Sequence, residues 1–257
     1  MILMKNFILF CFLITGLQSC IARCAPNAMF FFPINKEISI NSFFIIEGHG
    51  HDQETINSFK NRKVFLKNYS GEQIELKLRE IIKGQKQVTQ AIFYPIKILR
   101  PHTTYFLAYA NQTKRESASM HRHNHSKGRE ERVFWKTTGV ENTKIISPEF
   151  TIEFEKMKYN HSSCGPSINA IFNVRDLNKQ VVWFKTELVE LDSNKKMTYF
   201  LSITDKKLYV GHGMCSGAFS FERQGKYKVR FTPVNTDGKL LASTDWKIFE
   251  NPYLTYQ

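Results

Sequence analysis

Apolar and polar residues alternate along most of the chain after residue 26. Tyr227, Val229 and Phe231, for example, are separated by a lysine, an arginine and a threonine. Successive side chains of a strand point to opposite faces, so a period of two predicts strands that bury one face. The same alternation occurs over residues 74–78, 105–109, 133–135, 150–154 and 168–174. The one candidate helix, residues 53–63, is short and weakly amphipathic.

Turn-prone stretches separate these segments, for example residues 68–71 and 235–238. Many short strands joined by such turns indicate a β-sandwich rather than alternating strands and helices. A hydrophilic connector at residues 138–143 has about seven predicted strands on either side. The pattern therefore predicts an all-β protein with two tandem Ig/fibronectin-like β-sandwich domains, residues 26–139 and 145–250.

The first 19 residues have the pattern of an export signal. Lys5 is their only charge, and residues 7–14 are wholly apolar. A short basic start, an apolar centre and small residues at the exit are typical of a secretory signal peptide. After export, the basic surface of the protein is not expected to meet intracellular nucleic acid.

The exit of this signal, Leu17-Gln18-Ser19-Cys20, resembles the lipobox of bacterial lipoproteins. Gln18 departs from the small or aliphatic residue usual at that position. The resemblance implies that Cys20 is acylated and becomes the mature N-terminus, anchoring the protein to a membrane of the bacterial envelope, on its periplasmic or cell-surface side. The alternative is ordinary cleavage after Ala22, which would give a secreted protein.

The charge of the chain is strongly positive, with 36 Lys+Arg against 23 Asp+Glu in 257 residues and a formal net charge of +13. Removal of residues 1–19 takes away Lys5 alone and leaves +12. A basic surface suits nucleic acid, anionic lipid or acidic polysaccharide. For an exported protein we expect no nucleic-acid partner, and polar strand faces with one basic loop account for much of the charge.

Five cysteines are present, and Cys11 leaves with the signal. If Cys20 carries lipid, Cys24, Cys164 and Cys215 remain. Export permits disulfides, and closing a loop of this length stabilises a protein by about 4 kcal/mol in the chain-entropy model. We expect a Cys164–Cys215 disulfide, with Cys24 unpaired. Without acylation, a Cys20–Cys24 bond becomes possible.

Three motifs in the first half resemble the bacterial Ig-like domains of exported envelope proteins. They are a Pro-x-Asn-x-x-Ile turn at residues 33–38, a Leu-x-Pro corner that ends in tyrosine at residues 99–105, and a closing Phe-x-Lys-Thr strand at residues 134–137. The resemblance implies a β-sandwich over residues 26–139. It implies no particular activity, because this fold supports many functions.

Histidine is the main candidate for chemistry. His121, His123 and His125 alternate, so in an extended strand all three face one way and could hold Zn²⁺ or Cu²⁺. His49 and His51 form a second pair with the same spacing. The basic residues within the polar stretch 111–132 oppose a cation, and a solvated hairpin loop is the competing interpretation.

The glycine-rich stretch 211–217 is the most unusual in the chain. Cys215 near His212 could form a nucleophile and base, but glycines also allow close backbone approach around a disulfide. No hydrolase elbow, phosphate loop or metalloprotease motif occurs. Glu153 and Glu155 share an outward strand face with lysines nearby, which favours a salt-bridged surface. We therefore expect no enzyme activity.

Aromatic residues at 30–32 and 43–44 occupy both faces of their strands. They either pack between the two domains or form a surface for a sugar or protein, because exposed apolar patches usually mark interaction sites. The leading hypothesis is a non-catalytic envelope lipoprotein, without cofactor, that binds an envelope protein or polysaccharide. The alternative is a metal-binding protein that uses His121, His123 and His125.

Overall fold

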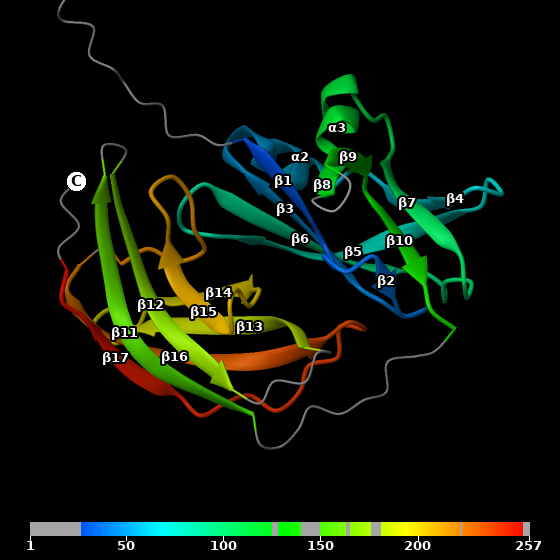
Figure 1. Cartoon of the computed structure of the whole chain (residues 1–257). Helices are drawn as coiled ribbons and strands as arrows, with labels where there is room; N and C mark the ends of the chain where they lie inside the picture. Colours follow the sequence, from blue (N-terminus) through cyan, green and yellow to red (C-terminus); the bar gives the residue numbers. More distant parts are fainter. Residues whose placement is uncertain are drawn as a thin grey trace, which may run out of the picture.

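The computed structural model describes residues 27–124, 128–139, 150–162, 165–175, 181–221 and 223–253. The predicted signal peptide, Cys20 and most of the connector lie outside these residues. Strands dominate the described chain, which confirms an all-β, sandwich-like fold (Figure 1). The division into two Ig-like domains stays a prediction, and we refer below to a first half (residues 27–139) and a second half (residues 150–253).

The first half contains one eight-stranded sheet in the order β1-β3-β6-β5-β4-β7-β10-β2. All neighbours are antiparallel except β10 and β2. The long strand β5 pairs with β4 near its start and with β6 further on, and its register shifts at a bulge between Leu78 and Glu80. The strands are β1 (Ala28–Phe32), β2 (Glu37–Ile38), β3 (Phe44–His49), β4 (Val64–Asn68), β5 (Gln73–Lys83), β6 (Val88–Pro95), β7 (Thr104–Tyr109) and β10 (Phe134–Thr137).

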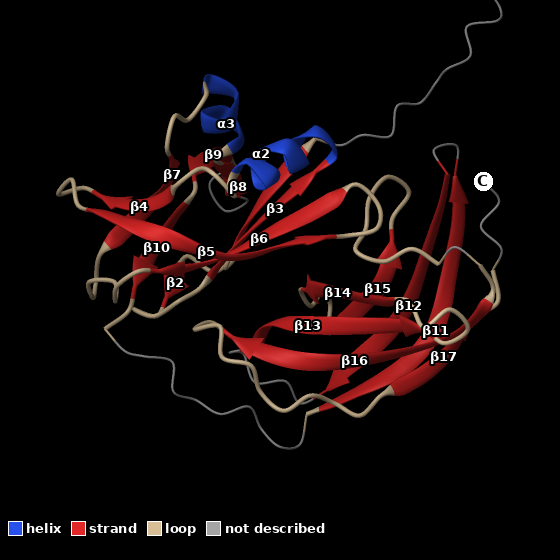
Figure 2. Cartoon of the chain, turned by 180° about the vertical axis from the view of Figure 1, so that it is seen from behind, coloured by secondary structure: helices blue, strands red, loops and turns tan. Residues whose placement is uncertain are grey.

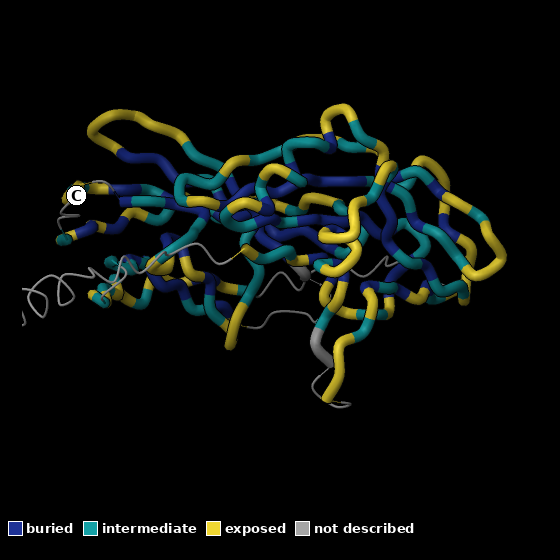
Figure 3. The backbone as a smooth tube through the Cα atoms, turned by 90° about the horizontal axis from the view of Figure 1, so that it is seen from above, coloured by how far each residue is buried: buried dark blue, intermediate teal, exposed yellow. Residues whose placement is uncertain are grey.

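The two ends of this sheet share one core. Phe44 and Ile46 from β3 pack in the same cluster as Leu66 from β4, Tyr105 from β7 and Trp135 from β10. Of the predicted inward residues in this half, those at 74, 76, 105, 107, 109, 133 and 135 are buried, while Leu78 is partly buried against the same core. Figure 3 shows burial concentrated along the strands and exposure at the loops. The alternation in the sequence therefore identifies the core-facing residues correctly.

Tyr105 closes the predicted Leu-x-Pro corner. Its hydroxyl accepts a hydrogen bond from the backbone N–H of Arg100 at 3.0 Å. The Thr137 hydroxyl donates to the carbonyl of Arg100 at 2.5 Å and accepts from the N–H of Thr103 at 2.9 Å. A tyrosine that bonds back to the chain just upstream is a feature of Ig-like sandwiches. These contacts join the corner motif to the closing strand.

Short elements cover one end of the first half. They are the 3-10 helix η1 (Gly50–Asp52), the helices α2 (Gln53–Ser58) and α3 (Lys114–Ser119), and the hairpin of β8 (His121–Asn124) and β9 (Arg129–Arg132). The predicted helix at 53–63 is present but ends at Ser58. The stretch 111–132 contains a hairpin, as expected, preceded by α3, which the sequence pattern does not predict.

The second half places a three-stranded sheet, β11-β12-β15, against a four-stranded sheet, β14-β13-β16-β17 (Figure 2). Phe172 from β12 packs on Phe231 from β16, with ring centroids 5.0 Å apart. Edge strand β11 departs from the expected burial because Phe154, just before a register shift, is 39% exposed. The strands are β11 (Thr151–Ser162), β12 (Gly165–Arg175), β13 (Val181–Glu190), β14 (Lys196–Leu201), β15 (Lys207–His212), β16 (Gly225–Asn235) and β17 (Lys247–Asn251).

A separate apolar cluster joins the two halves. Phe43 and Ile45 point away from the core of the first half and pack with Trp183 and Phe200 of the second half. The ring centroids of Phe43 and Trp183 are 4.8 Å apart. Strand β3 is thus buried on both faces, and packing between the halves accounts for the aromatic residues that lie at both parities.

The ion pair between Arg62 and Glu116 makes stability depend on pH. The guanidinium donates to both carboxylate oxygens at 2.5 and 2.7 Å, and these hydrogen bonds lower the pKa of Glu116 from 4.5 to about 2. A lowered pKa in the folded state stabilises the protein above pH 4.5, and this contribution is lost as the pH falls toward 2. We expect urea unfolding to show Glu116→Gln destabilised by about 2–3 kcal/mol at pH 7 and much less at pH 2.5.

The matched control is Glu75→Gln, which removes the pair with Lys63, an exposed lysine. Exposed pairs contribute little, so its unfolding free energy should change by less than about 1 kcal/mol at either pH. A Glu116→Gln deficit of equal size at both pH values would contradict the role of the ionised carboxylate.

Candidate functional site

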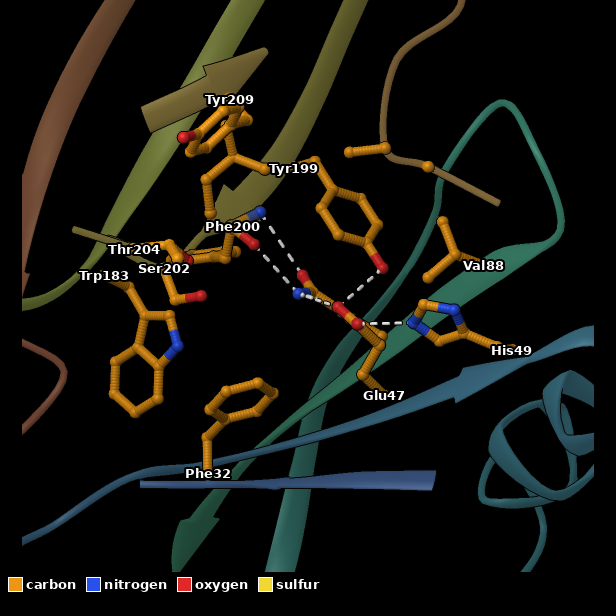
Figure 4. Close-up of a pocket in the computed structure, with 14 residues that line it drawn as sticks. Phe32, Glu47, His49, Val88, Trp183, Tyr199, Phe200, Ser202, Thr204 and Tyr209 are labelled. Atoms are coloured by element: carbon orange, nitrogen blue, oxygen red, sulfur yellow. Dashed lines mark hydrogen bonds and ion pairs between the residues drawn. The ribbon is translucent and has the colours of Figure 1, made fainter. Parts of the chain in front are cut away.

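A half-buried carboxylate lies where the two halves meet. Glu47 continues the face of β3 that carries Phe43 and Ile45, and its side chain is only 15% exposed. Tyr199 of β14 donates its hydroxyl proton to Glu47 Oε2 at 3.0 Å, and Gln90 of β6 donates to the same oxygen at 2.7 Å. Figure 4 shows the side chains of Tyr199 and His49 directed toward Glu47. The carboxylate is therefore held by residues from both halves.

Burial, together with the neighbouring Glu47 carboxylate, raises the pKa of Tyr199 well above its usual value. The phenol therefore stays protonated and keeps donating to Glu47. Donors reach both oxygens of the Glu47 carboxylate, so its orientation beside the cleft is fixed.

Hydrogen bonds to the backbone fix the two halves relative to each other. The side-chain amide of Gln90 donates to the backbone carbonyl of Phe200 at 2.9 Å and accepts from the backbone N–H of Phe200 at 3.2 Å. Lys86, in the turn between β5 and β6, exchanges two backbone hydrogen bonds with Gly217 at 3.1 and 2.8 Å. The position of Glu47 is thus set by packing and by hydrogen bonds across the interface.

A cavity of about 220 Å³ opens beside Glu47, between the halves. Its walls include the aromatic side chains of Phe32, Trp183, Tyr199 and Tyr209, and the hydroxyl side chains of Ser202 and Thr204. A larger chamber of about 560 Å³ shares Phe32, Glu47, His49 and Ser202 with it and extends along β1 to Ile34 and Arg122. We call the two chambers together the cleft.

Trp183 carries an unsatisfied donor in this cleft. The residue is 1% exposed, and its indole N–H has no hydrogen-bond partner in the described part of the chain. Figure 4 shows the indole nitrogen turned toward the interior of the cleft. Buried donors are rarely left unpaired, so this one calls for an acceptor that the described residues do not supply.

Ser216, His49 and Glu47 form a chain of hydrogen bonds across the interface. His49 Nδ1 lies 2.9 Å from Ser216 Oγ, and His49 Nε2 lies 2.7 Å from Glu47 Oε1. Serine hydrolases use these residue types, but they place serine at Nε2 and the carboxylate at Nδ1. Here the order is reversed, and Ser216 is not among the residues that line the cleft. The arrangement serves as a link between the halves.

A nucleophile and base formed by Cys215 and His212, the interpretation that the sequence does not favour, does not fit the structure. Cys215 is disulfide-bonded, so it presents no free thiol. His212 is buried, and its Nδ1 lies 2.7 Å from the carbonyl of Gly213 and 3.2 Å from Lys86 Nζ. Burial lowers the pKa of His212. The glycine-rich stretch therefore fits the backbone interpretation.

Cys164, the expected partner of Cys215, lies outside the described residues, and so does Cys24. Ser162 and Gly165 flank the missing position, and both lie next to Met214: the Ser162 hydroxyl contacts its sulfur, and a Cβ on Gly165 would lie 4.0 Å from its carbonyl. The Cys164–Cys215 pairing stays a prediction.

The structure describes the predicted metal site only in part. His121 is exposed in β8, and its Nδ1 lies 3.0 Å from the carbonyl of Ala118. The side chain of His123 and all of His125 lie outside the described residues. Within the described ranges, no group of three or more His, Cys, Asp or Glu residues is placed to hold a metal ion. A metal site on this loop stays a prediction.

The predicted salt-bridged surface is confirmed. Glu155 lies 2.6 Å from Lys207 Nζ and 3.2 Å from Lys156 Nζ, while Glu153 pairs with Arg175 at 3.5 Å. Both carboxylates therefore have cationic partners, as the sequence predicts.

The sequence pattern did not identify Trp183, Tyr199 or Arg122 as site residues. One signal was available: Glu47 directly follows the apolar run Phe43–Ile46, at a position that shares the parity of the buried residues Phe43 and Ile45. A charged residue at such a position needs polar partners. One of them, Tyr199, belongs to the second half, and the sequence does not specify how that half docks onto the first.

No family model matches this chain, and no curated protein matches it. Among solved structures, two crystal structures of pullulanase from Anoxybacillus sp. LM18-11, one of them complexed with maltotriose, match at 9% sequence identity and a TM-score of 0.25. The matches cover 79% of this chain for the complex and 84% for the other structure. The chain spans only 24% of either pullulanase chain.

No helix in the described ranges has the length and apolar character needed to cross a membrane.

Proposed function

We propose that this protein is a non-catalytic, exported lipoprotein of the bacterial cell envelope that binds a ligand in the cleft between its two halves. The observation that carries the proposal is the buried, unpartnered indole N–H of Trp183, turned into a preformed cavity with aromatic walls. Ligand sites are typically concave and largely apolar, with a few fixed polar groups. Glu47, Ser202 and Thr204 supply such groups here.

The location rests on the sequence. The apolar run 7–14 and the lipobox-like Leu17–Cys20 support export followed by acylation of Cys20. The proposed partners are therefore the membrane, through the N-terminal lipid, and an envelope polysaccharide or protein as the ligand. Lipid anchoring would keep the cleft close to the ligands that the envelope provides.

The absence of catalysis rests on the reversed order around His49 and on the position of Ser216 outside the cleft lining. A serine nucleophile must reach the bound substrate. Covalent labelling of Ser216 by a fluorophosphonate probe would contradict this part of the proposal.

The test of the proposed function is a cleft-filling variant. Calorimetry should detect binding of soluble polysaccharide or peptidoglycan fragments by the wild-type protein. Ser202→Phe, which places a ring in both chambers, should weaken that binding at least tenfold. Ser70→Phe, on the exposed turn between β4 and β5, should bind like the wild type. Equal binding by both variants, or no binding by the wild type, would overturn the proposal.

A further inference from the structure

We infer that the cleft is built for an acidic oligosaccharide, with Arg122 binding the carboxylate of the sugar. This inference rests on the proposed binding function and names the chemical class of its ligand. Three features carry it: a half-buried guanidinium without a carboxylate partner among the described residues, a set of unused hydrogen-bonding groups, and a neighbouring strand edge that is already occupied.

Arg122 lies in the wall of the larger chamber. Its guanidinium donates to the carbonyls of Pro33 and Ile34 at 3.1 and 3.3 Å, contacts the carbonyl of Phe31, and lies 5.1 Å from the ring centre of Trp135. Burial lowers the pKa of Arg122 to about 10. Even so, the group remains positively charged at neutral pH.

No carboxylate neutralises Arg122 among the described residues. Arg62 and Arg230, by contrast, each donate two hydrogen bonds to one glutamate. A guanidinium has five N–H donors, and the three carbonyls use three of them. Burying a charge is costly unless it is paired. An anionic group in the chamber would supply the missing partner and use the remaining donors.

The rest of the cleft suits the body of a sugar. Trp183 offers an N–H donor, and no hydrogen bond within the described chain uses the side-chain hydroxyl of Ser202 or Thr204. Glu47 receives three donors, which leaves room for one more on a carboxylate. These groups can hold sugar hydroxyls, while Phe30, 45% exposed at the mouth, offers a ring to the apolar face of a pyranose.

An extended peptide is the competing ligand. Strand β1 is the edge of its sheet, and a peptide could add to it as a further strand. The carbonyls that such a strand would need, those of Phe31 and Pro33, already accept from Arg122. This contact closes the edge to pairing and leaves the cationic side chain to a ligand in the chamber. The net charge of +13 also favours anionic ligands over neutral ones.

The test is calorimetry with three probes: trigalacturonate, the neutral galactotriose and the tripeptide trialanine. We expect trigalacturonate to bind at least tenfold more tightly than either of the others. Arg122→Gln should weaken trigalacturonate binding at least tenfold. Arg175→Gln, which removes an exposed arginine that pairs with Glu153, should change it less than twofold.

Because Arg122 also holds the edge of β1, its replacement could disturb folding. Trp183→Phe keeps the ring in the apolar cluster and removes only the donor, and it should weaken trigalacturonate binding at least threefold. Equal binding of galactotriose and trigalacturonate would overturn the inference while leaving the proposed function intact, as would preferential binding of trialanine. Failure of trigalacturonate to bind, or its unchanged binding to both variants, would also overturn it.

Discussion

Gly211→Ala is expected to prevent the second half from folding stably. Gly211 faces Asn169 across the ladder between β15 and β12. A Cβ built on Gly211 would lie 2.0 Å from the carbonyl oxygen of Ile168 and 2.8 Å from the Cα of Asn169. Both obstacles include backbone atoms, so no side-chain rotation relieves the overlap, and β15 would have to separate from β12.

The expected cost of Gly211→Ala is about 4 kcal/mol or more, because backbone displacement adds to overpacking and to strain at a φ of 156°. Chemical denaturation should therefore show a much lower midpoint, or a variant already unfolded in water. That loss would extend to the cleft, because Tyr199 and Trp183 depend on the same half.

The matched control is Gly213→Ala, two residues further on. A Cβ there would lie 3.5 Å from its nearest neighbour, the carbonyl of Ser216, which is an ordinary contact. The unfolding free energy of Gly213→Ala should differ from that of the wild type by less than about 1 kcal/mol, so its denaturation midpoint should stay close to the wild-type value. Similar midpoints for the two variants would show that β15 and β12 do not need glycine at this crossing.

The strands of this protein are predictable from sequence because each buries one face, and alternation reports the buried side. Ile168, Ala170, Phe172 and Val174 are all buried, as their spacing predicts. The same rule gives an ambiguous answer at Phe43 and Phe44, since β3 is covered on both sides. The pattern shows that something covers the second face but does not identify the covering surface.

The cleft could not be predicted for a related reason. Glu47 and Tyr199 are 152 positions apart, and His49 and Ser216 are 167 apart. No local propensity brings such residues together, because their approach depends on how the halves dock. Arg122 illustrates the same limit: it lies between two histidines in a polar stretch that suggests solvent, yet its guanidinium packs against Trp135 and bonds to the backbone of β1.

The predicted metal site rests on the spacing of three histidines alone. Alternating histidines share a face only within one continuous strand, and of these three histidines only His121 has a described side chain. The His121 ring already contacts the carbonyl of Ala118. A ligand set needs side chains fixed in three dimensions, which residue spacing does not provide.

Cys20→Ala is expected to move the protein entirely from the membrane fraction to the soluble fraction. If the lipobox-like sequence directs acylation, the lipid is the anchor, because each buried CH₂ contributes about 0.8 kcal/mol and stable attachment takes more than one chain. The measurement is palmitate labelling with fractionation in a bacterium that processes lipoproteins.

Cys24→Ala is the matched control for the anchor, because it removes a thiol four positions away and leaves Leu17–Cys20 intact. It should keep both the label and the membrane association of the wild type. If Cys20→Ala stays with the membrane, or if both variants lose the label, acylation at Cys20 is excluded as the anchor. Secretion after cleavage at Ala22 would instead leave even the wild type unlabelled and soluble, so the same gel separates the two routes of export.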